Sequence, residues 1–346
     1  MTRIFSISLI IAFLLCLSHK MKGQDAMYSQ AYAAPMLISP SFAGLTYGSR
    51  VSMNYRNQWP GASGAYVNYA LSWDGFFEKY NSGVGIMFNR NDQGEGMYVV
   101  QNLSLLYSYD LEVVRGYYIR PGIQFQLIDR SLNYDKLYFG DQINPDNGAV
   151  VIGANDVTGT LNNYKFDAAT SVMGYNKFAW IGLSADHLVK SEIGYTDMGN
   201  YNNIKLTAFG GTKFDLRKVL SGQTQQTLSF AFNYRTQGGF NQLEIGSYWF
   251  LNPLELGLWY RAYSQDAVIF IAGISLGSFK MAYSYDMTLS NLSGYSGGSH
   301  EISLIVQLND RFTSKSRYGA IPCPGVNHSF SGANKYTNTR RRSGVF

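Results

Sequence analysis

Charge is scarce in this sequence, and long apolar runs are confined to its start. Only 15% of the 346 residues are charged, whereas roughly a quarter are charged in an ordinary soluble domain. After residue 23, no stretch approaches the roughly 20 apolar residues that a membrane-spanning helix requires, which argues against a helical membrane protein. The mean hydropathy of −0.13 does not exclude a membrane barrel, because polar lumen residues dilute the lipid-facing ones.

Cysteine is nearly absent, and one of the two cysteines lies in a predicted leader. Residues 1–23 are typical of a secretory signal peptide, with a basic start, an apolar run and a short polar end. Lipidation of Cys16 is the alternative, but Leu15 stands before it where a small residue is expected. Cleavage at the end of the leader leaves Cys323 alone, which excludes an intramolecular disulfide. A signal peptide followed by a barrel predicts the bacterial outer membrane.

Sequence motifs of enzymes, cofactor sites and metal sites are also missing. We find no Gly-x-Ser-x-Gly, no His-Glu-x-x-His, no phosphate-binding loop and no paired cysteines. We therefore expect no enzyme, no catalytic residue, no cofactor, no metal and no nucleic-acid partner. One long linker holds oxygen-bearing side chains without the ordered spacing of a calcium loop, which predicts a solvated loop: Asp141, Asp146, Asn147, Asn155 and Asp156.

Short alternating segments are what the chain does contain. In residues 103–109 and again in 279–285, every second residue is large and apolar, and most of the others are small or polar. Strand side chains point to opposite faces with a period of two, so each segment has one apolar and one polar face. Many such segments, rich in tyrosine and phenylalanine, predict an all-β fold, a transmembrane antiparallel up-and-down β-barrel of about fourteen strands with an apolar face toward lipid.

Alternation and turn residues place these strands along residues 49–308. They are expected near 49–57, 66–74, 81–91, 97–110, 115–128, 164–173, 177–187, 203–213, 225–235, 240–250, 253–262, 266–275, 278–287 and 300–308. An even number of strands brings the two ends of the barrel's chain to the same side of the membrane, the periplasm. If the first strand rises from the periplasm, the longest linkers (129–163, 188–202 and 288–299) all face outward, as outer loops of such barrels do.

Two segments flank the barrel. Residues 24–48 contain aromatic residues and methionine that disordered segments lack, so we expect a plug or constriction folded into the barrel mouth from the periplasm. Residues 309–346 are expected to form a flexible basic tail in the periplasm, since seven basic residues stand against Asp310 from residue 308 onward. The net charge of +5 therefore belongs to the tail and leader, and the barrel itself is slightly acidic.

Charged residues on the predicted lumen faces are candidate sites. Arg50 and Arg56 share one face of the first strand, either as a lumen charge site or as partners of carboxylates across the interior. The candidate carboxylates are Asp74, Glu255, Asp286 and Glu301.

Several pieces of the sequence together resemble one family. Residues 24–32 read Gln-Asp-Ala-Met-Tyr-Ser-Gln-Ala-Tyr, residues 39–44 read Ser-Pro-Ser-Phe-Ala-Gly, and the first strand reads Arg-Val-Ser-Met-Asn-Tyr-Arg-Asn-Gln-Trp-Pro over 50–60. Phe-Gly-Asp-Gln-Ile at 139–143 and His-Glu-Ile-Ser-Leu at 300–304 follow in order. The chain thereby resembles the PorP/SprF family of type IX secretion system outer-membrane proteins.

The resemblance implies a barrel that works with the type IX secretion and gliding apparatus and supports export or surface anchoring of a secreted surface protein. The expected partners are periplasmic and outer-membrane components of that apparatus, the secreted protein and the lipid bilayer. We infer that the tail docks onto the periplasmic components through Arg340, Arg341 and Arg342; a merely solvated tail is the alternative. The barrel alone would also allow a diffusion channel or a hydrophobic-solute transporter.

The linker lengths predict which residues reach the cell surface. Cysteine introduced at Asn155, Asn200 or Ser293 should react with an impermeant maleimide on intact cells, because all three lie in the long linkers. The native Cys323 in the tail should stay unlabelled and serves as the control. Labelling of Cys323 without labelling at the other three positions would show that the barrel has the opposite orientation.

Overall fold

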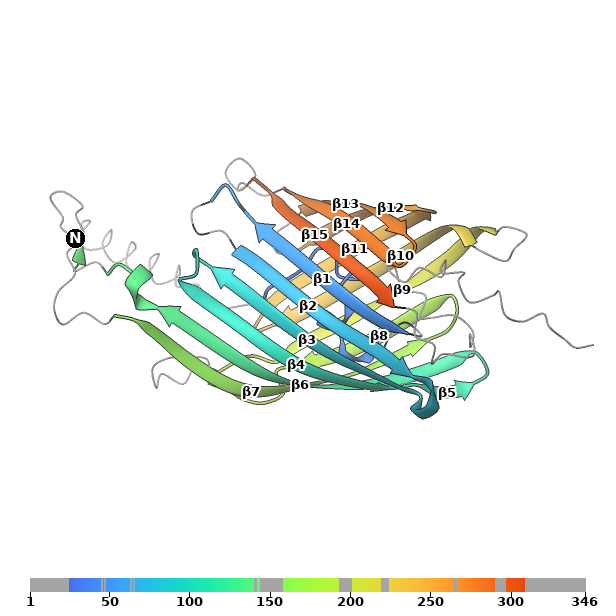
Figure 1. Ribbon diagram of the computed structural model, residues 1–346, viewed down its shortest axis with the longest axis horizontal. Coiled ribbons are helices and arrows are strands. Elements are labelled where there is room, and N and C mark those ends of the chain that lie inside the picture. The colour runs from blue at the N-terminus through green and yellow to red at the C-terminus, as the bar shows by residue number, and fades with distance from the viewer. Residues whose placement is uncertain are drawn as a thin grey trace, which may run out of the picture.

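The computed structural model describes residues 25–44, 46, 48–62, 64, 66–139, 142–143, 158–192, 201–218, 224–263, 267–289 and 297–308. Both the predicted leader and the predicted tail lie outside the described residues. The described part is an antiparallel barrel whose strands are inclined to its long axis (Figure 1). None of its helices is long and apolar enough to cross a membrane.

Apart from the short β5, strands that follow one another in sequence pair with one another all the way round the barrel. The strands are β1 (Ser49–Gln58), β2 (Tyr66–Phe77), β3 (Ser82–Gln93), β4 (Tyr98–Tyr109), β5 (Leu111–Val114), β6 (Tyr117–Asn133), β7 (Thr160–Tyr175), β8 (Ala179–Asp186), β9 (Lys205–Lys218), β10 (Thr224–Gln237), β11 (Phe240–Leu251), β12 (Leu254–Ala262), β13 (Ala267–Leu276), β14 (Phe279–Thr288) and β15 (Ser299–Leu308). Pairing of β1 with β15 joins the first strand to the last, and β4 pairs directly with β6.

The prediction of fourteen strands in a closed barrel is confirmed. The fifteenth strand among the described residues is β5, a segment of 4 residues that follows β4 and pairs only with the start of β6. It adds no wall to the barrel, because β4 and β6 already pair along most of their length. Because β1 pairs with β15 and β4 with β6, the fourteen wall strands form a closed ring without the free sheet edge that lipid could not satisfy with hydrogen bonds.

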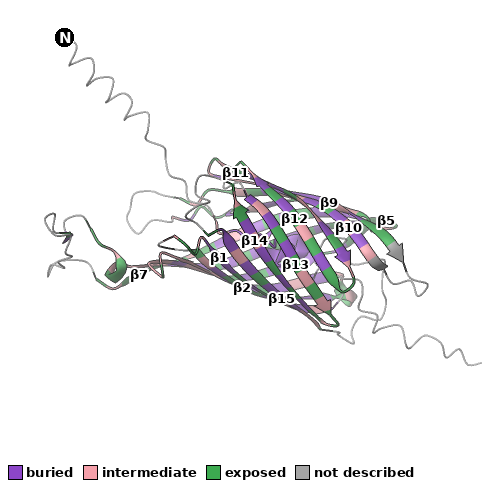
Figure 2. Cartoon of the chain, turned by 90° about the horizontal axis from the view of Figure 1, so that it is seen from above, coloured by how far each residue is buried: buried purple, intermediate pink, exposed green. Residues whose placement is uncertain are grey.

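Alternation of burial along each strand separates a lumen face from a lipid face, as the bands of buried and exposed residues show in Figure 2. In β15, Glu301 and Ser303 are buried toward the lumen, while Ile302 and Leu308 are exposed on the outside. The first strand pairs with the last in a register that sets Arg56 opposite Glu301. The lumen faces of distant parts of the sequence are thereby brought together.

Linker lengths alternate around the barrel. The longest linkers join β6 to β7, β8 to β9 and β14 to β15, and all three lie at the same end of the barrel. The opposite end has tight connections such as those between β11 and β12 and between β13 and β14. We call these the long-linker end and the short-turn end. If the sequence-based orientation holds, the long-linker end faces outward.

Two leucines on the outer face of β12 test the lipid-facing assignment. Leu258 lies in the middle of the strand and Leu254 at its end, and both side chains are about half exposed, at 52% and 49%. A charge at the bilayer midplane costs about 2–4 kcal/mol, against about 0–1 kcal/mol near the interface. Leu258→Arg should therefore reduce the amount of heat-modifiable, folded barrel much more than Leu254→Arg. Equal losses for the two variants would contradict the depth assignment.

Candidate functional site: the occupied lumen

The lumen is occupied by the chain's own N-terminal segment, residues 25–44, which we call the lead-in. Asp25 contacts the ends of β8, β9 and β10 at the long-linker end, whereas Gly44 lies against β2, β3 and β6 at the short-turn end. The lead-in therefore runs through the lumen from one end to the other before β1 begins. The sequence predicted a plug or constriction folded into the barrel mouth from the periplasm; the contacts of the lead-in extend along the lumen to both ends.

Two short 3-10 helices give the lead-in its shape. They are η1 (Pro35–Leu37) and η2 (Pro40–Phe42), and each starts with proline, which tolerates the first helical position because its missing N–H would be unpaired there. The side chain of Ser39 accepts a hydrogen bond from the backbone N–H of Ser41 and caps η2. These compact turns let a short segment fill the width of the lumen.

A single carboxylate on β15 holds the backbone of the lead-in. Glu301 accepts hydrogen bonds from two consecutive backbone N–H groups, those of Ser29 at 2.7 Å and Gln30 at 3.1 Å. The Gln30 carboxamide is also bonded at both ends, since its nitrogen donates to the hydroxyl of Ser284 at 3.3 Å and its oxygen accepts from Ser303 at 2.6 Å. Charge-assisted bonds of this kind are stronger than neutral ones.

A network of buried ion pairs surrounds this contact. Asp286 lies 2.9 Å from Arg56 and 3.0 Å from Arg261, and Arg261 continues to Glu244 at 2.8 Å. The Ser29 hydroxyl donates to Asp286 at 2.6 Å and accepts from Arg261 at 3.0 Å. The network thus joins β1, β11, β12 and β14 to the lead-in, and removal of one charge would leave its buried partner uncompensated.

Aromatic rings of the barrel wall pack against two aromatic residues of the lead-in. The ring centroid of Tyr32 lies 5.8 Å from that of Trp180 and 6.0 Å from that of Trp259, and Phe42 lies 5.0 Å from Phe209. Tyr32 and Phe42 are almost fully buried. Such pairs contribute about 0.5–1.5 kcal/mol each beyond the burial of apolar surface, so packing anchors the lead-in at these two residues.

Glycine makes room for the lead-in backbone near the short-turn end. A Cβ on Gly83 would collide with the carbonyl of Ala43, and one on Gly122 would collide with the backbone at Ser41. Arg120 completes the contact, because its guanidinium donates to the carbonyls of Ala43 and Gly44. The close approach of two backbones here needs residues without a side chain.

A charged cluster holds the other end of the lead-in. His187 follows β8, and its ring nitrogens contact Asp25 at 2.9 Å and Asp167, while Lys205 lies 2.9 Å from Asp25 and 3.6 Å from Asp186. Burial alone would lower the pKa of His187, but the carboxylates of Asp25 and Asp167 raise it to about 9. Burial would raise the pKa of Asp25, yet Lys205 and His187 hold it well below its usual value. His187 and Asp25 are therefore charged and paired at neutral pH.

The lumen charges named from sequence form ion pairs in three separate groups. Arg50 lies 2.8 Å from Asp74, and Arg56 lies 2.9 Å from Asp286 and 3.4 Å from Glu301. Glu255 contacts neither arginine; it lies 2.6 Å from Lys280. The tail arginines at 340–342 and the loop oxygens expected to be solvated, from Asp141 to Asp156, lie outside the described residues.

Sequence reasoning missed Arg261, Glu244, Arg120 and His187. Arg261 and Glu244 stand at lumen positions of strands that were predicted correctly, so counting inward positions along β11 and β12 could have found them. Arg120 likewise occupies a lumen position of β6. No local signal marks His187, because its partners Asp25 and Asp167 are distant in sequence.

Part of the lumen wall makes no hydrogen bond to the lead-in. Both side-chain polar atoms of Asn54, Asn233 and Gln242 are buried without a hydrogen-bond partner among the described residues. A buried polar group left in this way costs about 1–3 kcal/mol. The wall can thus make more hydrogen bonds than the lead-in supplies.

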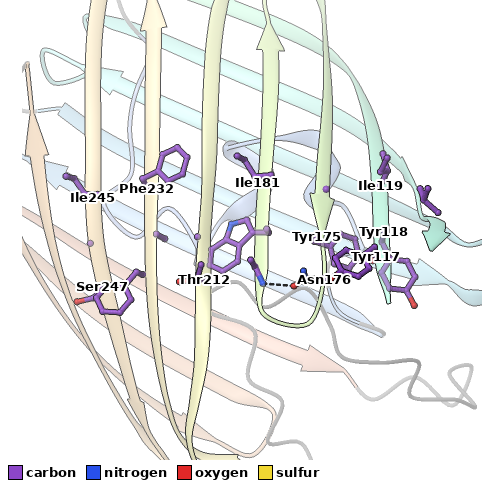
Figure 3. Close-up of a pocket in the computed structure, with 18 of the residues that line it drawn as sticks. Tyr117, Tyr118, Ile119, Tyr175, Asn176, Ile181, Thr212, Phe232, Ile245 and Ser247 are labelled. Carbon is purple, nitrogen blue, oxygen red and sulfur yellow. Dashed lines mark hydrogen bonds between the residues drawn. The ribbon is translucent and has the colours of Figure 1, made fainter. Parts of the chain in front are cut away.

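A pocket in the barrel wall is a separate feature. It has a volume of about 1210 Å³, spans β5 to β12 and is lined largely by apolar residues (Figure 3). Its lining comes from both faces of the wall: Ile119, Ile181 and Ile245 are exposed on the outside, whereas Tyr118 and Trp180 are buried.

These observations define a class: an antiparallel membrane barrel whose lumen contains its own N-terminal segment. The family model described as "Type IX secretion system membrane protein PorP/SprF" matches residues 20–306. The chain belongs to this family, which confirms the resemblance seen in the sequence and makes the chain an outer-membrane component of type IX secretion. Gliding motility is implied by the same family.

Other comparisons are distant. The chain matches none of the curated proteins. Omp33 of Acinetobacter baumannii is 9% identical, with a TM-score of 0.44, over 77% of this chain and 100% of that one. A mutant of TodX, a monoaromatic hydrocarbon channel, is 9% identical, with a TM-score of 0.45, over 81% and 93% of the two chains. Because neither TM-score reaches 0.5, these structures say nothing of what this chain binds.

Substitution of one glycine should displace the lead-in. Gly122→Ala places a methyl group against the backbone at Ser41, so the lead-in must move. Gly174→Ala on the neighbouring strand is the control, because its nearest atom would be 4.0 Å away. Limited proteolysis of purified barrels should cut within residues 25–44 in the first variant only. Equal resistance of both variants would show that the backbones do not approach as described.

Alkaline pH should release the long-linker end of the lead-in. The pKa of His187 is raised from 6.5 to about 9, so its contribution to docking is fully present below about pH 6.5 and is lost as the pH rises through about 9. Hydrogen exchange of residues 25–30, corrected for intrinsic rates, should therefore accelerate between pH 7 and 9. His187→Gln should remove this dependence on pH, and an unchanged dependence in that variant would assign it to another group.

Proposed function

We propose that this barrel supports the export or surface anchoring of a partner secreted protein, and that it acts through binding and not through catalysis or diffusion of solutes. The observation that carries the proposal is the occupied lumen. A lead-in held by ion pairs at the long-linker end, by aromatic packing at Tyr32 and Phe42, and by backbone contacts at the short-turn end lies along the path that a solute would take. Membership of the PorP/SprF family supports a role of the barrel in type IX secretion.

The tail takes part in this proposal as a docking segment. Residues 309–346 are strongly basic, and Arg340, Arg341 and Arg342 form their densest positive charge. Such a segment suits an acidic surface of a periplasmic secretion or gliding component, with an attraction that weakens as salt increases. The barrel then provides the membrane anchor, the tail contacts the machinery below it, and the long-linker end receives the secreted partner.

Loss of a surface protein tests the proposal. A strain without this chain should lack at least one secreted protein from its surface, detected by quantitative proteomics of surface-shaved peptides, and the full chain should restore it. Truncation after Asp310 should leave the barrel folded but restore less of that protein. An unchanged surface proteome in the strain without the chain would overturn the role in export and anchoring.

Conductance distinguishes the diffusion channel. Purified full-length barrel in planar bilayers should show no steady open-pore current, and deletion of residues 26–40 should produce one while the barrel remains folded. A steady current from the full-length protein, together with a normal surface proteome in the strain without it, would favour a channel.

A further inference from the structure

The barrel wall contacts both the backbone and the side chains of Ser29 and Gln30. Glu301 accepts the backbone N–H groups of two consecutive residues, a contact that any non-proline pair can make. Other residues of the wall bind the side chains of Ser29 and Gln30. A hydroxyl is held by Asp286, Arg56 and Arg261, and a carboxamide is held at both its nitrogen and its oxygen.

The wall residues that bind Ser29 and Gln30 come from several strands. Arg56 lies on β1, Arg261 on β12, Ser284 and Asp286 on β14, and Glu301 and Ser303 on β15. All six residues are almost fully buried on the lumen face. The site is thus a preformed part of the barrel wall, and only its occupant comes from the lead-in.

We propose that this part of the wall is a peptide-binding site that holds residues 29–30 in the closed barrel and accepts a segment of the secreted partner when the lead-in leaves. The inference rests on the proposed function for the identity of the partner. The segment that fits carries a hydroxyl residue followed by a carboxamide residue. Its backbone would donate two consecutive N–H groups to Glu301, as Ser29 and Gln30 of the lead-in do.

Further hydrogen-bonding capacity next to the site favours a polar occupant. Asn233 faces Glu244 across the β10–β11 pair, and Gln242 lies two residues before it on β11. Both carboxamides are buried and bond to none of the described residues. A partner segment with more polar side chains than the lead-in would satisfy them.

The tether of the lead-in controls the exchange. A segment joined directly to β1 has an effective concentration on the order of millimolar at its own site. A free peptide therefore binds only after the lead-in has been removed or weakened. In the full chain, the partner needs additional contacts outside this site to replace the lead-in.

A peptide added in trans tests the site directly. The probe is a fluorescent synthetic peptide with the sequence of residues 26–40, titrated into purified barrel that lacks those residues. We expect saturable binding to this barrel and none to the full-length protein. Glu301→Gln in the shortened barrel should weaken binding at least tenfold, since hydrogen bonds to a charged group are lost. Glu255→Gln is the matched control, because Glu255 pairs with Lys280 and should leave affinity unchanged.

The probe itself tests the specificity. A peptide with Ser29→Ala and Gln30→Leu should bind at least tenfold more weakly, and a scrambled peptide should not saturate. If the shortened barrel fails to fold, the full chain with Tyr32→Ala and Phe42→Ala replaces it, since its weakened lead-in should yield to the same probe. Equal binding of the altered and scrambled peptides, or none to a folded barrel, would overturn the site. That result would leave the loss of a surface protein in the deletion strain, and hence the proposed function, unaffected.

Discussion

Burial of charge in the lumen is the constraint on which the rest of the structure depends. Arg56, Asp286, Arg261 and Glu244 are almost wholly inaccessible, and each is tolerated only because a charge of opposite sign lies beside it. Strand closure brings these residues together from the two ends of the sequence. The lead-in then enters as part of the same network, through the Ser29 hydroxyl and the two N–H groups on Glu301.

The lumen wall has two parts that hold the lead-in by different physics. Tyr32 and Phe42 are held by aromatic packing against β8, β9 and β12, which depends little on salt or pH. Asp25 is held by ion pairs at the long-linker end, which depend on both. If the long-linker end faces outward, as the linker lengths predict, a protein approaching from the cell surface would meet the charged end first. A barrel closed in this way suits a protein that responds to a partner better than one that conducts solutes continuously.

Much of the fold was predictable because lumen-facing and lipid-facing residues alternate along each strand of a membrane barrel, which gives the sequence a period of two. Strand number, strand positions and the faces of β15 follow from that period, since lipid accepts only apolar residues on one face. Arg50 and Arg56 were found on the lumen face for the same reason. The path of the lead-in was not predictable. Its contacts join Asp25 to His187 and Ser29 to Glu301. The sequence around His187 and Glu301 contains no local pattern that predicts these contacts.

Ser41 and Ser171 offer the most direct test of the central claim, that the lead-in lies inside the lumen. Their hydroxyl oxygens are 2.6 Å apart, a separation from which two cysteines can form a disulfide after a small adjustment. In a chain with Cys323→Ser, we predict that Ser41→Cys and Ser171→Cys become linked in native membranes and resist maleimide until reduced. Ser41→Cys with Ser52→Cys, on β1, should remain unlinked. Free thiols in the first pair, within a folded barrel, would contradict the occupied lumen.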